Sequence, residues 1–297
     1  MTSALKLVDD AEPFFGHKAC AGCGGALAVR IALKVLGPRA ISILPAGCMS
    51  AVGFNFPQLA FKDNAMISTF AGTASLMSGV LAGMQRSGED DFCVVGFAGD
   101  GGTADIGIQA LSGAIDRDDD LLYICYDNEA YMNTGIQKSS LTPYGASTTT
   151  TPVDAHGQAT LTQKKDMFAI VRAMGAPYVA TASVGYLDDY ATKVETASHI
   201  RGFKYIHVLA PCPTGWGSAV DSAVELAREA VDCGLWYLAE SIEGEAKLSR
   251  NPLARGGAFS SVAHYLKAQR RFKHLDDASI AAIEQHRDEV WQGLASL

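Results

Sequence analysis

The chain has 297 residues, of which 48% are hydrophobic and 19% charged, and its formal net charge is −8. This composition predicts a globular protein with a full core, and the lack of a basic run argues against nucleic acid as a partner. We expect no membrane span, because no apolar run reaches the roughly 18–20 residues required. Residues 1–10 do not resemble a signal peptide, so the expected location is the cytoplasm, where disulfides are rare.

Helices and strands are predicted to alternate along most of the chain. The predicted elements are helix 26–36, strand 41–44, helix 74–85, strand 92–98, helix 103–115, strand 121–126, helix 166–174, strand 178–181, helix 187–200, strand 204–209 and helix 219–233. Strands 92–98 and 121–126 are near-continuous apolar runs, as expected for parallel strands covered on both faces. The alternation predicts an α/β fold with a doubly wound, mainly parallel sheet.

Two segments depart from this alternation. Residues 127–165 are polar and rich in Thr, Gly, Asn and Pro, and loops of this length in compact domains are usually functional or disordered. Residues 241–297 are more polar than the rest and predict one or two helices, such as 272–294. We therefore predict a domain at residues 1–240 and a C-terminal helical arm at 241–297, which covers the domain or a partner subunit.

A Gly-Asp-Gly-Gly motif stands where strand 92–98 ends and a helix begins, at residues 99–102. Glycines let a phosphate approach the backbone, and free N–H groups at a helix N-terminus attract anions. Asp100 could hold a hard cation such as Mg²⁺. Asn128 follows the next strand and could supply a second oxygen ligand. The motif therefore predicts a diphosphate–metal site; the structural alternative is a tight turn without a ligand.

The seven cysteines fall into two groups. Cys20 and Cys23 form a Cys-x-x-Cys pair, which by itself fits a redox dithiol, zinc or an iron–sulfur cluster. Cys48 and Cys212 lie in turns rich in Gly and Pro, and four such cysteines suffice for tetrahedral zinc or a cubane cluster. The other three are in predicted strands or at a helix end and are expected to pack in the core: Cys93, Cys125 and Cys233.

Together, these motifs resemble the thiamine-diphosphate-binding β subunits of the 2-oxoacid:ferredoxin oxidoreductases, closest to the pyruvate synthase type. The segments that carry the resemblance are GHKACAGCG (16–24), GC (47–48), GDG (99–101), DNEAYMNTG (127–135), LTPYGA (141–146), PYVATAS (177–183) and APCPTGW (210–216). They span roughly residues 16–240, and their joint occurrence is far more specific than any one of them.

The resemblance implies a role for each matching residue. The four turn cysteines would bind one 4Fe–4S cluster: Cys20, Cys23, Cys48 and Cys212. Asp100, Asn128 and the backbone carbonyl of Ala130 would hold Mg²⁺ on thiamine diphosphate. Asn133 would be the catalytic residue beside the reacting carbonyl. The implied lining of the cofactor is Gly99, Gly101, Gly102, Asn133 and Thr134. Residues 147–151 would lie near the cofactor or a subunit contact.

The implied activity is oxidative decarboxylation of a 2-oxoacid, pyruvate or a close analogue, to acyl-CoA and CO₂. Electrons would pass through the cluster to ferredoxin or a similar acceptor. In this family a glutamate that acts on thiamine comes from the α subunit, and this chain has neither a ferredoxin-like cysteine run nor a coenzyme A domain. We therefore expect a catalytic subunit that is inactive alone and needs an α subunit with γ and ferredoxin-like δ subunits or their equivalents.

Several alternatives stay open at this stage. Residues 49–61 depart from the pyruvate type, so phenylglyoxylate, oxalate and branched 2-oxoacids are alternative substrates. Phe54 and Phe56 could face the substrate or pack within the loop, and His17 could bond near the cluster or only shape its turn. A non-redox thiamine enzyme with bystander cysteines is one rival hypothesis. A structural zinc protein or assembly subunit without redox activity is another.

Overall fold

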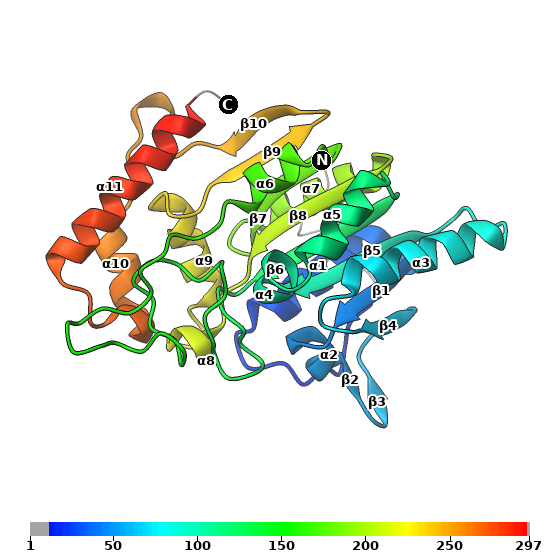
Figure 1. Ribbon diagram of the computed structural model, residues 1–297, viewed down its shortest axis with the longest axis horizontal. Coiled ribbons are helices and arrows are strands. Elements are labelled where there is room, and N and C mark those ends of the chain that lie inside the picture. Colours follow the sequence, from blue (N-terminus) through cyan, green and yellow to red (C-terminus); the bar gives the residue numbers. More distant parts are fainter. Residues whose placement is uncertain (1–11, 296–297) are drawn as a thin grey trace.

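A single eight-stranded sheet organises residues 12–295, the part of the chain that the computed structural model describes (Figure 1). Its strand order is β10-β9-β7-β8-β6-β5-β1-β4. Six strands run parallel, while β9 is antiparallel to both of its neighbours, β7 and β10. Residues 1–10, which do not resemble a signal peptide in sequence, lie outside the described residues.

The elements follow the predicted alternation closely. The strands of the sheet are β1 (Ala40–Pro45), β4 (Ala65–Ser68), β5 (Cys93–Gly99), β6 (Leu121–Asp127), β7 (Tyr178–Ser183), β8 (Phe203–Leu209), β9 (Leu238–Ile242) and β10 (Glu245–Arg250). A separate hairpin joins β2 (Phe54–Asn55) to β3 (Gln58–Leu59). The helices are α1 (Gly24–Leu36), α2 (Cys48–Gly53), α3 (Thr73–Arg86), α4 (Asp100–Ala104), α5 (Ile108–Asp116), α6 (Met167–Ala173), α7 (Leu187–His199), α8 (Pro213–Trp216), α9 (Ala223–Asp232), α10 (Val262–Lys267) and α11 (Asp277–Leu294).

Helices cover both faces of the sheet, which confirms the doubly wound prediction. The apolar faces of α1 and α7 pack on one side, and those of α3, α5 and α6 pack on the other. All seven residues of the central strand β6 are buried, as its continuous apolar sequence indicated. A third cluster joins α9, α10 and α11 around Trp216 beside the sheet. No helix within residues 12–295 is both long and apolar enough to cross a bilayer.

The structure corrects the prediction of one continuous helix over residues 103–115. The chain forms α4 from Asp100 and then breaks before α5, because Asp105 leaves the helical conformation at φ −111° and ψ −89°. Gly107 permits the break: a Cβ atom there would lie 2.1 Å from the carbonyl oxygen of Gly102. The predicted start at Thr103 was therefore three residues too late.

Several further elements were not predicted from the sequence, among them α2, the β2–β3 hairpin and strand β4. The turn after Cys212 contains the single helical turn α8, and residues 238–250 form the antiparallel pair β9–β10 at the sheet edge. Strand β10 is mostly exposed, so it lacks the apolar run by which the other strands were recognised. The helical part of the C-terminal arm follows β10. The division of the chain at residue 240 stays a prediction.

Candidate functional site

The acidic motif and the polar loop meet at one edge of the sheet. Strands β5 and β6 are parallel neighbours, with Gly99 paired to Tyr126. Asp100 and Asn128 therefore leave adjacent strands at the same carboxyl edge, where open α/β sheets bind their ligands. Apart from one isolated bridge, residues 128–165 form no helix or strand, as predicted, and they fold over this edge.

Three oxygen atoms converge beside Asp100. The side-chain oxygen of Asn128 lies 3.0 Å from Oδ1 of Asp100 and 2.9 Å from the carbonyl oxygen of Ala130. With the amide turned over, its nitrogen would donate to both oxygens instead. Ligands about 2.0–2.1 Å from an octahedral Mg²⁺ stand about 2.9 Å apart at adjacent vertices. The two distances from the Asn128 oxygen thus fit adjacent ligands of one magnesium ion.

Asp100 is enclosed by the protein. Its side chain is 1% exposed, and Ser139 donates a hydrogen bond to its Oδ2 atom. Burial, followed by the negative charge of Asp127, raises the pKa of Asp100 well above its usual range. A buried carboxylate without a cationic partner is unfavourable, so a bound cation would stabilise its charged form.

A small cavity of about 40 Å³ lies beside this carboxylate. Three stretches line it, residues 45–48, 99–102 and 130–134, together with Phe70, Tyr126 and Asn128. No side chain caps α4, so its first N–H groups have no partner within the helix. A Cβ atom at position 101 would lie 2.3 Å from the ring of Tyr131, which explains the glycine there. The cavity is far smaller than the roughly 300–1,000 Å³ of a typical ligand pocket, so it can hold part of a cofactor but not enclose it.

Cysteines from three separate segments of the chain approach one another beside the cavity: Cys20 and Cys23, Cys48, and Cys212. Gly24 donates a hydrogen bond of 3.0 Å to the carbonyl oxygen of Pro211, which brings the start of α1 against the segment that carries Cys212. A Cβ atom at Gly24 would lie 2.7 Å from that backbone, so the contact requires glycine. The sulfur atoms of Cys23 and Cys212 each accept a backbone N–H at 3.4 Å, from Ala26 and Gly215.

The thiol of Cys48 interacts electrostatically with the other three turn cysteines and with Asp100. Burial raises the pKa of the Cys48 thiol to about 12, with further contributions from Cys212, Cys23, Asp100 and Cys20. Within residues 12–295, however, no three Cys, His, Asp or Glu side chains are gathered tightly enough for a single metal ion. Thiolates on one zinc ion would be about 3.8 Å apart, given zinc–sulfur bonds of about 2.3 Å. A cluster would instead spread its ligands over several irons, and which of the two these thiols bind stays a prediction.

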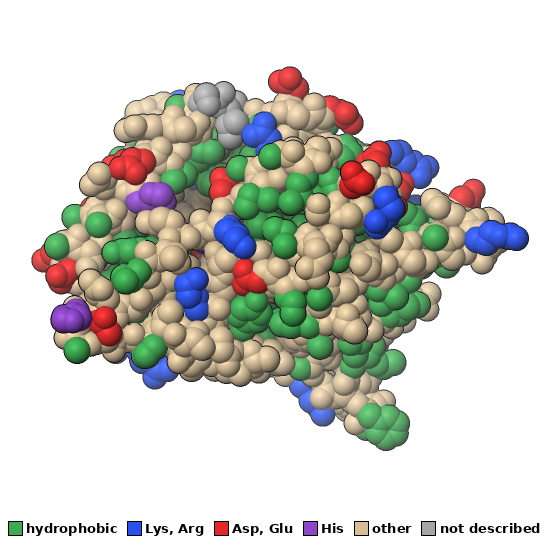
Figure 2. All heavy atoms as spheres, in the orientation of Figure 1, with side chains coloured by type: hydrophobic (Ala, Val, Ile, Leu, Met, Phe, Trp, Pro, Cys, Tyr) green, Lys and Arg blue, Asp and Glu red, His purple; other side chains and the backbone are tan. Residues whose placement is uncertain are grey.

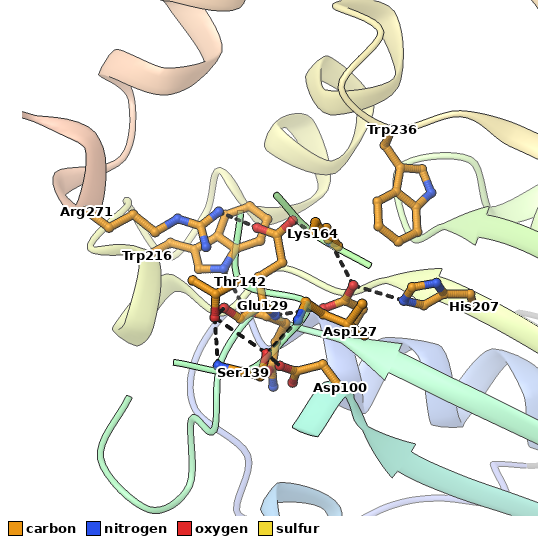
Figure 3. A network of polar contacts seen from close by, with 12 residues as sticks. Asp100, Asp127, Glu129, Ser139, Thr142, Lys164, His207, Trp216, Trp236 and Arg271 are labelled. Atoms are coloured by element: carbon orange, nitrogen blue, oxygen red, sulfur yellow. Dashed lines mark hydrogen bonds and ion pairs between the residues drawn. The ribbon is translucent and has the colours of Figure 1, made fainter. Parts of the chain in front are cut away.

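A buried charge network, not foreseen from the sequence, supports the loop that carries Asn128 (Figure 3). Asp127 bonds to Nε2 of His207 at 2.9 Å and to Nζ of Lys164 at 2.7 Å. Lys164 also contacts Glu129 at 2.8 Å. Burial works to raise the pKa of Asp127, but Lys164 and His207 outweigh it and hold that pKa at about 2. The buried carboxylate is therefore kept ionised by its partners.

The remaining predicted site residues lie at the rim or away from it. Asn133 and Thr134 are exposed and line the cavity. Residues 147–151 do not line it but pack on the loop beside it, where Thr149 donates to the carbonyl oxygens of Gly135 and Ile136. The sequence favoured neither role for His17; its ring stacks on Phe14 with centroids 4.7 Å apart.

The structure also shows where the two candidate aromatic residues and the three expected core cysteines lie. Phe54 packs against Phe61, whereas Phe56 is 99% exposed on the β2–β3 hairpin, which projects from the body in Figure 1. Cys125 and Cys233 are buried, as expected of core cysteines. Cys93, at the start of β5, is only partly buried, because it lies at the end of the sheet away from the cavity.

A second, larger cavity lies on the other side of the Asp127–Glu129 turn. Its volume is about 190 Å³, and its walls include Trp236, Tyr237 and residues of α11. Figure 2 shows the surface hollowed between α11 and the end of the sheet. Lys164 and Glu129 line this cavity, but Asp100 and the clustered cysteines do not. The residues predicted to bind Mg²⁺, Asp100, Asn128 and Ala130, line the smaller cavity instead.

Comparisons with known proteins agree with this geometry. Residues 45–208 match the family model described as the thiamine pyrophosphate enzyme C-terminal TPP binding domain. The pyruvate synthase subunit PorB of Methanothermobacter thermautotrophicus is 46% identical over 282 residues, which cover 94% of this chain and 96% of that protein. The ketoisovalerate oxidoreductase subunit VorB of Pyrococcus horikoshii is 43% identical over 293 residues, covering 96% and 93%.

A solved structure shares the fold. The 2-oxoglutarate:ferredoxin oxidoreductase from Magnetococcus marinus superposes with a TM-score of 0.58 at 22% identity, over 74% of this chain and 81% of that chain. At this identity the likeness concerns the fold alone.

Proposed function

The chain belongs to the thiamine-diphosphate-binding β subunits of the 2-oxoacid:ferredoxin oxidoreductases, and from this premise we propose that its four turn cysteines carry a 4Fe–4S cluster beside a magnesium–thiamine site. The proposed reaction is oxidative decarboxylation of pyruvate or a close analogue, with coenzyme A as acyl acceptor and ferredoxin or a similar protein as electron acceptor. The family membership expected from the sequence motifs is confirmed by the relatives.

One observation carries the proposal: Cys48 belongs to both parts of the site. It lines the cavity that contains Asp100, and its thiol lies close to those of Cys20, Cys23 and Cys212. A cluster on these thiols would therefore border the cofactor directly. Short separation is what one-electron transfer from a cofactor to a cluster requires, so the arrangement suits a redox enzyme better than a decarboxylase with bystander cysteines.

Separate residues of this chain would hold the metal ion, the diphosphate and the cluster. Asp100, Asn128 and the carbonyl oxygen of Ala130 would hold Mg²⁺, and the backbone of Gly101 and Gly102 would receive the diphosphate. When bound, thiamine diphosphate supplies the ring that stabilises negative charge after a 2-oxoacid loses CO₂. The backbone N–H groups of Ala26 and Gly215 donate to the sulfur atoms of Cys23 and Cys212, and such bonds to the ligands of a cluster would tune its reduction potential.

Asn133 is the residue that we propose to act on the substrate. Its side chain is exposed at the rim of the cavity, where it would face a substrate bound to the cofactor. The cavity does not enclose a cofactor, which supports completion of the site by an α subunit. We further propose γ and ferredoxin-like δ subunits, or equivalents, as the remaining partners.

Two 2-oxoacid classes deserve direct comparison. The PorB relative favours pyruvate, but the VorB relative is almost as similar, at 43% against 46% identity, which favours a branched 2-oxoacid as the second candidate. We would assay the purified complex with pyruvate, ketoisovalerate and phenylglyoxylate, with coenzyme A and a viologen acceptor. Absence of coenzyme A-dependent viologen reduction with every acid would overturn the proposed reaction.

Metal content tests the site independently of turnover. Anaerobically purified protein should be brown and contain roughly four irons per chain; a colourless protein with one zinc would support the structural rival. Asp100→Ala should abolish magnesium-dependent thiamine diphosphate binding. The matched control Asp91→Ala removes an exposed carboxylate that pairs with Arg39 on the surface and should bind normally. Normal binding by the Asp100 variant would contradict the metal assignment.

A further inference from the structure

We propose that Trp216 and Arg271 are positioning residues that hold the cluster loop (residues 210–217) and the metal loop (residues 127–130) in a fixed relation, with the C-terminal arm as their anchor. Neither residue lines the cavity beside Asp100. They would therefore act through the ligands that they hold and not on the substrate. This inference rests on the proposed function, since it concerns the ligands of the same cluster and magnesium ion.

Trp216 joins the two loops directly. It ends α8, the helical turn that begins just after Cys212, and its backbone N–H bonds to the Cys212 carbonyl oxygen at 2.8 Å. Its indole N–H donates to the carbonyl oxygen of Asn128 at 2.9 Å. The side chain is fully buried, so water does not compete for this bond. One helical turn and one hydrogen bond thus connect a proposed cluster ligand to a proposed magnesium ligand.

Arg271 fixes this connection from the C-terminal arm. Its guanidinium lies over the Trp216 ring, 4.1 Å from the centroid, and bonds to the carboxylate of Glu129. The Arg271 side chain is almost completely buried, and its Nε atom donates to Gln269 at 2.9 Å. The carbonyl oxygen of Arg271 accepts the N–H of Ser147 at 2.9 Å. A single side chain of the arm therefore contacts both loops (Figure 3).

Glu129 explains why the metal loop needs such an anchor. It adopts a left-handed backbone with φ 68°, which is uncommon for a residue other than glycine. Its two neighbours, Asn128 and Ala130, supply the oxygens that converge on Asp100. The conformation is held from both ends: Thr142 donates to the Glu129 carbonyl oxygen at 2.8 Å, and the carboxylate lies between Lys164 and Arg271. Loss of Arg271 would free one side of this turn.

The contributions of Trp216 and Arg271 can be tested separately in the whole purified complex. Trp216→Phe keeps an aromatic ring but removes the N–H donor together with part of the indole. Arg271→Met removes the charge, and Arg271→Lys keeps it without the planar group that stacks and binds in a fork. Arg270→Met is the matched control, because the neighbouring arginine is exposed in the same turn. Iron content and thermal unfolding would first establish that each variant is loaded and folded.

Two readouts other than turnover decide the outcome: the dissociation constant of thiamine diphosphate with Mg²⁺, and the cluster's electron paramagnetic resonance spectrum and midpoint potential. Loss of residues that orient metal ligands typically weakens metal binding about 10–100-fold. We therefore expect at least tenfold weaker binding and a shifted potential in Trp216→Phe and Arg271→Met, a smaller change in Arg271→Lys, and no change in Arg270→Met.

Wild-type affinity and wild-type cluster properties in Trp216→Phe and Arg271→Lys would overturn the inference, even if Arg271→Met failed to assemble. Changes of equal size in Arg270→Met would also overturn it, because they would reflect the charge of the turn and not the specific contacts of Trp216 and Arg271. Failure of the proposed function looks different: the wild-type complex itself would lack iron or would not bind thiamine diphosphate with Mg²⁺.

Discussion

Replacing Lys164 by Met should destabilise the protein substantially, because it leaves two buried carboxylates with one fewer cation. The Lys164 ammonium lies 2.7 Å from Asp127 and 2.8 Å from Glu129, and these side chains are 0% and 7% exposed. It also lies over the Trp236 ring, 4.6 Å from the centroid. Methionine preserves most of the side-chain volume, so the change is mainly one of charge.

The structure sets the size of the expected effect. Removing one partner of a buried ion pair typically costs about 3–5 kcal/mol. Each carboxylate keeps another partner, since Asp127 retains His207 and Glu129 retains Arg271. We therefore expect the lower end, about 3 kcal/mol. At about 2–4 °C per kcal/mol, the ratio for domains of roughly 150–250 residues, the midpoint of thermal unfolding should fall by about 6–12 °C.

Thermal unfolding of the purified protein, followed by circular dichroism, measures this shift. Lys165→Met is the matched control, because that lysine is 41% exposed and contacts Asp105 at 3.5 Å; exposed pairs contribute about 0–1 kcal/mol. Adding Asp127→Asn to Lys164→Met should recover part of the loss, since it removes one of the uncompensated charges. Equal midpoints for the two lysine variants, or no recovery in the double variant, would refute the reasoning.

Three further outcomes follow from the same geometry. Gly101→Ala should weaken thiamine diphosphate binding, because the new methyl group would meet the Tyr131 ring. Gly79→Ala is the control: position 79 on α3 has open space around it, so this variant should bind normally and gain about 0.5–1 kcal/mol in stability. Ser139→Ala removes the hydroxyl that donates to the buried carboxylate of Asp100, the proposed magnesium ligand, so the magnesium concentration needed for cofactor binding should rise about 10–100-fold; an unchanged requirement would contradict its role. Burial raises the pKa of Cys233 to about 12. Alkylation of this thiol in native protein, measured by mass spectrometry, should therefore be negligible at pH 8 and increase only as the pH approaches the thiol pKa. Fast labelling at pH 8 would contradict this by showing that the thiol is accessible.

The fold was readable from the sequence wherever the hydrophobic pattern was strong. Strands β5 and β6 were recognised because they are buried on both faces, and burial on both faces produces a continuous apolar run. Strand β10 was missed for the opposite reason: it is an edge strand with mostly exposed residues. The break between α4 and α5 was also missed, because it depends on a close backbone approach at Gly107 that leaves no mark on hydrophobic periodicity.

The candidate ligands were named from the sequence because their chemistry is carried by residue type. Cysteines in turns, Asp100 between glycines and Asn128 after the next strand were identified before any contact was known. The sequence could not supply the buried supports, Lys164, His207 and Arg271. They come from distant segments, and lysine, arginine and histidine are common enough that no local spacing distinguishes these from surface residues.

By itself, then, the sequence determined the α/β alternation, the family and the candidate ligand residues, because these depend on local pattern and on residue chemistry. Tertiary structure alone decided which groups meet. It placed Cys48 and Asp100 in the lining of one cavity, and it brought Arg271 of the C-terminal arm onto Trp216 and Glu129. Such contacts join residues more than fifty positions apart, and only the packing of the sheet, the loop and the arm sets their distances.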